Sequence, residues 1–80
     1  MHELTIALSI IDGVCEELQS RGDPKLCALH LQIGKMSGVV KESLLFCYEQ
    51  ACEGTPLAGS ALVIDETAGS ELLITAMEIE

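Results

Sequence analysis

Hydrophobic side chains recur every three or four residues over the first quarter of the chain, and polar residues fill the positions between them. This spacing predicts an amphipathic helix over residues 4–20, which ends at Gly22 and the Asp-Pro pair that follows it. Gly13 weakens the middle of this helix relative to alanine, and we interpret it as a point of close packing against a neighbour. The apolar face consists of Leu4, Ala7, Leu8, Ile11, Val14, Cys15 and Leu18.

The pattern changes to alternation over residues 26–33, which predicts a strand. One side of this strand carries Cys27, Leu29, Leu31 and Ile33, and the other carries Leu26, Ala28, His30 and Gln32. A second helix is predicted over residues 40–53, and two more strands over residues 61–66 and 71–79. The apolar stripe of the second helix consists of Leu44, Leu45, Tyr48, Ala51 and Cys52.

The order of these elements predicts how the strands pair. A strand, a helix and a second strand form a right-handed crossover that makes the two strands parallel. Only Ala68-Gly69-Ser70 joins the last two strands, and so short a connection predicts an antiparallel hairpin between them. The expected fold is one α/β domain over residues 1–80, with a three-stranded mixed sheet, two helices packed on one face and the order α-β-α-β-β.

Composition narrows the possible partners. The chain has 80 residues, of which 49% are hydrophobic, so one small core is expected. A formal net charge of -9 repels phosphate backbones and anionic membrane surfaces, and it predicts neither a nucleic-acid nor a membrane partner. No apolar run approaches the roughly 20 residues of a membrane-spanning helix, and no leader pattern is present. We therefore expect a cytoplasmic protein.

Cysteine usage argues against an enzyme with a reactive thiol. Cys15, Cys27, Cys47 and Cys52 all lie within helical or strand-like apolar patterns, which favours buried, inert thiols over disulfides. There is no Cys-x-x-Cys pair, so a zinc site built from these four is the less favoured alternative. No glycine-rich phosphate loop is present either, and we expect no catalytic residues.

The start of the chain is the strongest candidate for chemistry. Met1, His2 and Glu3 place a terminal amine, a backbone amide, an imidazole and a carboxylate next to one another. Nitrogen donors in such an arrangement suit Ni(II) or Cu(II). The alternative is a disordered tail, and Glu3 is equally well explained by the helix dipole, which favours an acid at a helix N-terminus. For His30, a solvated or cross-strand histidine is favoured over a metal ligand.

Several segments together resemble the nickel-binding domain of the HypA/HybF family of metallochaperones. The resemblance covers nearly the whole chain, with the segments in the family's order. It rests on Met1-His2-Glu3 followed by a helix, residues 31–39 (LQIGKMSGV), residues 45–49 (LFCYE), Glu53-Gly54-Thr55 followed by residues 61–64 (ALVI), and residues 71–80 (ELLITAMEIE).

This resemblance implies a function and a set of partners. It implies a non-enzymatic domain that binds Ni(II) through Met1, His2 and Glu3 and helps to insert nickel into [NiFe] hydrogenase, and in some bacteria urease. The implied partners are the GTPase HypB and the hydrogenase large subunit. The alternative is a docking module for that GTPase which binds no metal. We expect mainly monomer, with a strand-swapped dimer as a further possibility.

The chain also departs from the family pattern. Family members carry a zinc domain with two Cys-x-x-Cys pairs between the last two strands, where this chain has Ala68-Gly69-Ser70. None of the four cysteines matches those zinc ligands, so the resemblance implies no structural zinc and a module that has been excised or lost. Val40 stands where the family often has an acidic residue, and any support that carboxylate gives the nickel site is missing.

Overall fold

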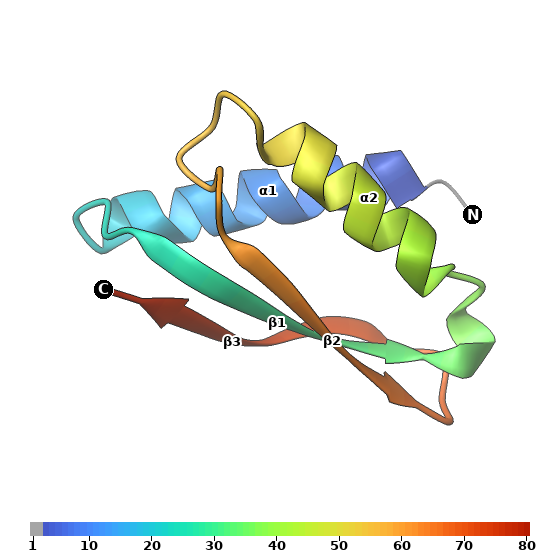
Figure 1. Cartoon of the computed structure of the whole chain (residues 1–80). Coiled ribbons are helices and arrows are strands. Elements are labelled where there is room, and N and C mark those ends of the chain that lie inside the picture. Colours follow the sequence, from blue (N-terminus) through green and yellow to red (C-terminus); the bar gives the residue numbers. More distant parts are fainter. Residues whose placement is uncertain (1–2) are drawn as a thin grey trace.

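The computed structural model describes residues 3–80, and Met1 and His2 lie outside the described residues. The elements follow one another in the predicted order, and Figure 1 shows both helices on the same face of the sheet. This confirms the predicted α/β class. The elements are α1 (Glu3–Ser20), β1 (Leu26–Gly34), a short 3-10 turn η1 (Lys35–Ser37), α2 (Lys41–Cys52), β2 (Ala61–Thr67) and β3 (Leu72–Ile79).

The sheet has the strand order β2-β1-β3, with β1 in the centre. β2 runs parallel to β1, as the crossover rule predicts, and β3 pairs with the other side of β1 in the antiparallel direction. The predicted hairpin between β2 and β3 is therefore wrong. The helix-facing side of β1 carries Leu29, Leu31 and Ile33, which are all buried. The central place of β1 in the sheet puts this apolar side beneath the helices.

The short connection after β2 reaches the far side of the sheet by crossing the end of β1. The backbone N–H of Gly34 donates to the Glu71 carbonyl at 2.8 Å, and that of Met36 donates to the Gly69 carbonyl at 2.9 Å. A Cβ atom at Gly34 would collide with the backbone carbonyl of Gly69. Gly34 is thus the residue that lets the two backbones cross at this distance.

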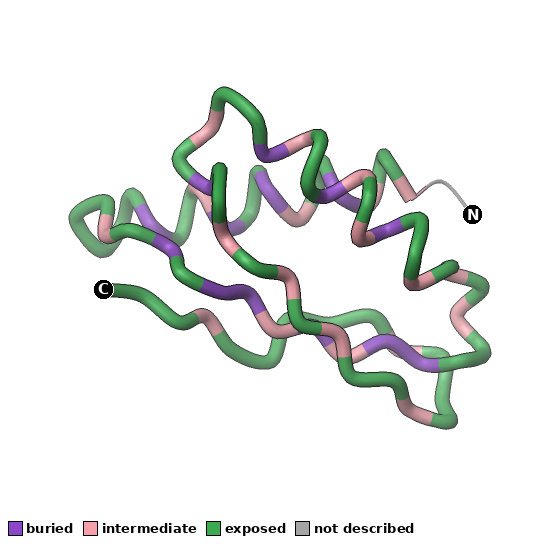
Figure 2. Tube along the Cα trace, in the orientation of Figure 1, coloured by how far each residue is buried: buried purple, intermediate pink, exposed green. Residues whose placement is uncertain are grey.

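The core lies between the sheet and the helices, as the purple segments of Figure 2 show. Leu29 and Leu31 of β1 are fully buried, and Leu57 closes the core from the loop after α2. β2 and β3 contribute no buried residue, so the centre of the sheet carries most of the packing. The helices contribute Ala7, Ile11, Val14, Leu18, Leu44, Tyr48 and Cys52.

A β-bulge at the start of β1 changes which side chains face the core. Leu26 pairs with Ile79 and Ala28 with Glu78, so Cys27 is the extra residue on β1. Leu26 is consequently 1% exposed, and Cys27 is exposed. The prediction that Cys27 shares the core face and has a buried thiol is wrong, because the bulge interrupts the alternation.

The surface of α1 holds a second correction. A Cβ atom at Gly13 would meet no atom within 4 Å, so Gly13 does not mark close packing.

Neither helix in residues 3–80 is long and apolar enough to cross a membrane.

Candidate metal site at the chain start

Glu3 connects the beginnings of the two helices. It is the first residue of α1, and its Oε2 atom accepts a hydrogen bond from the backbone N–H of Val40 at 3.2 Å. Val40 is the N-cap residue of α2, and its own side chain provides no capping hydrogen bond. The Glu3 carboxylate also lies in the first turn of α1, where the helix dipole favours negative charge. Glu3 therefore has a structural role that needs no metal, whatever further role it has.

The loop before α2 brings residues far apart in sequence to the start of α1. This loop turns at Gly38, which has φ 81°, and the Ser37 hydroxyl accepts a hydrogen bond from the Val39 N–H at 3.2 Å. Met36 and Val40 on the same loop are 77% and 51% exposed. The residue that follows the two predicted nitrogen ligands is thus anchored beside an open surface loop.

The described residues do not complete a metal site by themselves. No group of three or more His, Cys, Asp and Glu side chains in residues 3–80 is placed to hold a metal ion. Of the predicted ligands, only Glu3 belongs to that range. A nickel site at this end of the molecule would need Met1 and His2.

His30 is paired across the sheet. Its Nε2 atom lies 2.6 Å from Oε2 of Glu78 on β3, and the backbone carbonyl of His30 accepts a hydrogen bond from the Thr75 hydroxyl at 3.3 Å. This is the cross-strand arrangement that the sequence favoured. One imidazole and one carboxylate provide two ligands, which is too few for a tight transition-metal site.

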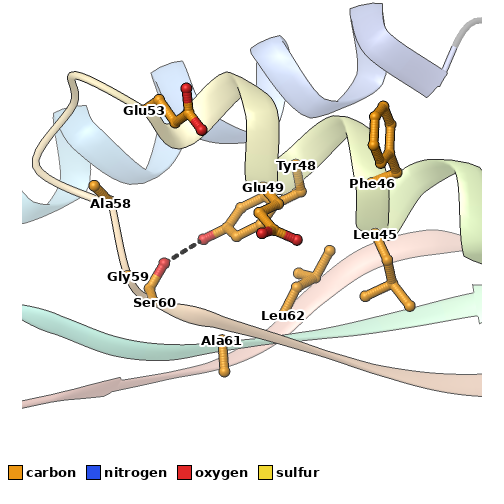
Figure 3. Close-up of a pocket in the computed structure, with 10 residues that line it drawn as sticks. All are labelled: Leu45, Phe46, Tyr48, Glu49, Glu53, Ala58, Gly59, Ser60, Ala61 and Leu62. Carbon is orange, nitrogen blue, oxygen red and sulfur yellow. Dashed lines mark hydrogen bonds between the residues drawn. The ribbon is translucent and has the colours of Figure 1, made fainter.

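A cleft of about 660 Å³ lies between α2 and β2, and sequence reasoning did not single it out. Figure 3 shows Tyr48 at its base, hydrogen-bonded to Ser60 at 2.8 Å, with Phe46, Glu49 and Glu53 on the helix side. The Ser60 hydroxyl donates to the Leu57 carbonyl, so Tyr48 is the donor to Ser60. Burial raises the pKa of the Tyr48 hydroxyl well above its usual range. In the described part of the chain, no His or Cys lines this cleft, and the raised pKa keeps the Tyr48 hydroxyl protonated at neutral pH.

Glu71 is a second residue that sequence reasoning missed. Its Oε2 atom accepts hydrogen bonds from Gln32 Nε2 at 2.8 Å and from the Thr67 hydroxyl at 2.7 Å. The hydrogen bond from Gln32, together with those from its own backbone and Thr67, lowers the pKa of the carboxyl group. These hydrogen bonds connect Glu71, just before β3, to Gln32 of β1 and to Thr67 at the end of β2.

Comparison with known proteins identifies the family. Residues 1–79 match the family described as "Hydrogenase/urease nickel incorporation, metallochaperone, hypA". The chain belongs to this HypA family. It is 47% identical over 66 residues to the hydrogenase maturation factor HypA of Chlorobaculum parvum, a match that covers 82% of this chain and 58% of that protein. For the HypA of Streptomyces avermitilis the identity is 46% over 70 residues, covering 86% of this chain and 53% of the relative.

The solved structures agree on the fold. The solution structure of the Ni metallochaperone HypA from Helicobacter pylori aligns with a TM-score of 0.68 at 19% sequence identity, over 100% of this chain and 94% of that one. The family match over residues 1–79 and the identity to the curated relatives confirm the resemblance inferred from the sequence at the level of the HypA family. The chain spans a little over half the length of the curated HypA relatives described above.

In this HypA-family chain, the four cysteines differ in exposure. All four are free: Cys52 is buried, Cys15 and Cys47 are partly buried, and Cys27 is exposed. Burial raises the pKa of the Cys52 thiol, which makes it a poorer nucleophile and a poorer metal ligand at neutral pH. The predicted burial of the thiol is confirmed for Cys52.

Proposed function

We propose that this chain is a nickel-carrying domain of a metallochaperone, which binds Ni(II) at its N-terminus and hands it on during enzyme maturation. The ligands would be the amine of Met1 and the amide and imidazole nitrogens of His2. Family membership supports the activity, and the hydrogen bond from Val40 N–H to Glu3 is the structural observation that carries the site. It holds the residue next to the ligands at a fixed place on the surface.

Glu3 then acts beside the metal through its position. Its carboxylate already accepts the Val40 N–H, so it orients the first turn of α1 and supplies negative charge near a cation. Met36 and Val40 leave this end of the molecule open, which favours transfer of the ion to a partner. A site with few protein donors suits a carrier that must release its cargo.

The donors determine how such a site responds to conditions. An amine, an imidazole and an amide must lose protons to bind, so nickel affinity falls as the pH falls. Cu(II) binds nitrogen donors more strongly than Ni(II) does, and it would compete in vitro. Selectivity for nickel would come from metal supply and from the partner.

The recipients follow from the family. We propose delivery toward [NiFe] hydrogenase, or urease, with the GTPase HypB and the hydrogenase large subunit as partners that meet the chain in the cytoplasm. The chain would act as one nickel-binding domain over residues 1–80, without catalysis. It would hold no structural zinc if, as the resemblance implies, residues 68–70 stand in place of the zinc module. Docking to the GTPase without any metal is the rival function.

The test is a Ni(II) titration of the untagged chain and of a version with one glycine added before Met1. We expect one nickel per chain, with the visible absorption of square-planar nickel, in the untagged protein alone. His30→Gln is the matched control, and it should leave the titration unchanged. Equal binding by the extended chain would contradict the terminal site, and absence of nickel binding in both would leave docking as the function.

A further inference from the structure

A groove runs between α1 and β3 on the helix-covered side of the sheet. It joins two hollows of about 400 and 500 Å³ that share Ile74, and we call it the α1–β3 groove. Its floor and walls are largely apolar, with small side chains on the α1 wall. The α1 wall includes Ser9 and Gly13, and the β3 side includes Leu72 and Ile74.

The β3 side of this groove is open because β3 is an edge strand. Within residues 3–80, β1 is its one paired strand, so the outer backbone edge of β3 has no ladder partner. Leu72 and Ile74 lie opposite the buried Ile33 and Leu31, yet they remain 38% and 45% exposed. Exposed apolar side chains beside an unpaired backbone edge are the features that recruit another strand.

The edge has few of the features that keep strands apart. β3 contains neither lysine nor proline, which commonly protect exposed edges. Thr75 is an extra residue opposite the His30–Leu31 step, and this bulge limits regular pairing to short stretches on either side of it. A short peptide strand therefore fits the edge better than a long flat interface does.

Charge decides which strand would bind. Glu71, Glu78 and Glu80 lie on or next to β3, and Glu17 lines the groove from α1. The one basic residue of the groove lining, Arg21, is paired with Glu17 at 2.8 Å. A second copy of the chain would bring another net charge of -9 against the same surface, whereas a basic strand would be attracted.

We propose that the α1–β3 groove binds a basic, apolar-alternating segment of a partner protein, which adds to β3 as a fourth strand. Its apolar side chains fill the space beside Ile74 under the small residues Ser9 and Gly13. Its lysine or arginine side chains on the other face lie near the acidic residues on or next to β3, which are Glu71, Glu78 and Glu80. Glu3, the candidate ligand that the structure describes, does not line this groove, and the proposed peptide binding goes beyond nickel carriage.

The test uses a synthetic peptide of alternating lysine and valine, with blocked ends, titrated into the metal-free 80-residue chain and followed by amide shifts in NMR. We expect saturable shifts in β3 and in the groove-facing side of α1. A peptide with glutamate in place of lysine should bind at least about tenfold more weakly, because the charge contribution is then repulsive.

Two variants locate the site. Ser9→Trp fills the groove without changing the β3 edge, and it should lower the affinity for the lysine peptide at least about fivefold. Ser43→Trp makes the same change on the exposed side of α2 and should have no effect. Circular dichroism of both variants checks that they fold, and Ile74→Lys, which places a like charge in the groove, serves as a second groove variant.

Four results would overturn the proposal: no saturable binding, equal binding of both peptides, shifts confined to β2, or a β3-mediated dimer of the free chain in sedimentation. Because no metal is present, the result is independent of nickel carriage. A chain that binds the peptide but no nickel, or nickel but no peptide, separates the two proposals.

Discussion

Ile64 and Ile74 are the same residue type on either side of Leu31, yet they have different surroundings. Ile64 on β2 lies opposite Leu31 in the parallel pair, is half-buried and packs against the core. Ile74 on β3 lies opposite Leu31 in the antiparallel pair and is 45% exposed. The connection through α2 brings a helix over β2, whereas β3 joins the sheet beyond the cover of α1. Topology, more than side-chain type, decides which edge strand of this sheet keeps its apolar side chains more exposed.

The largest effect is expected from closing the path that places β3 on its side of the sheet. Gly34→Val puts a branched side chain into the Gly69 backbone, and neither segment can move without losing the hydrogen bonds that join them. We expect a loss of about 3 kcal/mol or more in the free energy of unfolding, measured in urea. A stable variant with an intact β1–β3 ladder by NMR would show that the crossing is looser than described.

Truncating the two isoleucines tests the comparison directly. Ile64→Ala should cost about 2 kcal/mol and Ile74→Ala about 1 kcal/mol, because the first removes more buried contact from the same chemical group. Urea unfolding of both variants gives the difference in their free energies of unfolding. The dependence of that free energy on urea concentration is compared as well. Equal losses would mean that β3 is packed as firmly as β2 in solution.

A smaller gain is expected on the wall of the open groove. Gly13→Ala adds a methyl group where no atom lies within 4 Å, so it brings helix propensity without a clash. The free energy of unfolding should rise by up to about 1 kcal/mol. Thermal unfolding of the variant checks this, and a loss of stability would indicate that the groove beside Gly13 is filled.

The smallest effect is expected when acid protonates Glu71, whose carboxylate accepts hydrogen bonds from Gln32 and Thr67 just before β3. The hydrogen bonds of Glu71 lower the pKa of its carboxyl group in the folded state, so this group contributes stability above its unfolded pKa, near 4.3. That contribution is lost as the pH falls through the lower folded value. Glu71→Gln should therefore show a smaller drop in urea midpoint between pH 6 and pH 3 than the parent chain. Identical pH profiles of the urea midpoint would show that the Glu71 carboxylate does not stabilise the connection between β2 and β3.

Particular residues show where sequence reasoning succeeded. The second helix was predicted over residues 40–53 and runs over Lys41–Cys52, because Leu44, Tyr48 and Cys52 recur at the helical period. The alternation of Leu29, Leu31 and Ile33 likewise predicted their shared buried face. Long periodic stretches repeat one preference many times, and the resulting element types were right.

The errors arose where one residue or one crossing changes the outcome. The hairpin was wrong because a short connection, residues 68–71 in the structure, can also cross the end of a neighbouring strand when that strand offers a glycine, here Gly34. Cys27 was placed on the wrong face because a bulge shifts the alternation by one residue. The prediction of buried thiols is confirmed for Cys52 and is wrong for the exposed Cys27.

The order and type of the elements, the family and the candidate ligands Met1, His2 and Glu3 follow from the sequence, because periodicity and local motifs are properties of neighbouring residues. The tertiary structure decided which strand became central, which of the two edge strands stayed more exposed and what Glu3 contacts. The hydrogen bond between Glu3 and Val40 joins residues 37 positions apart, and no local pattern encodes such a contact. It forms because burying the apolar faces of both helices on one side of the sheet brings their first turns together.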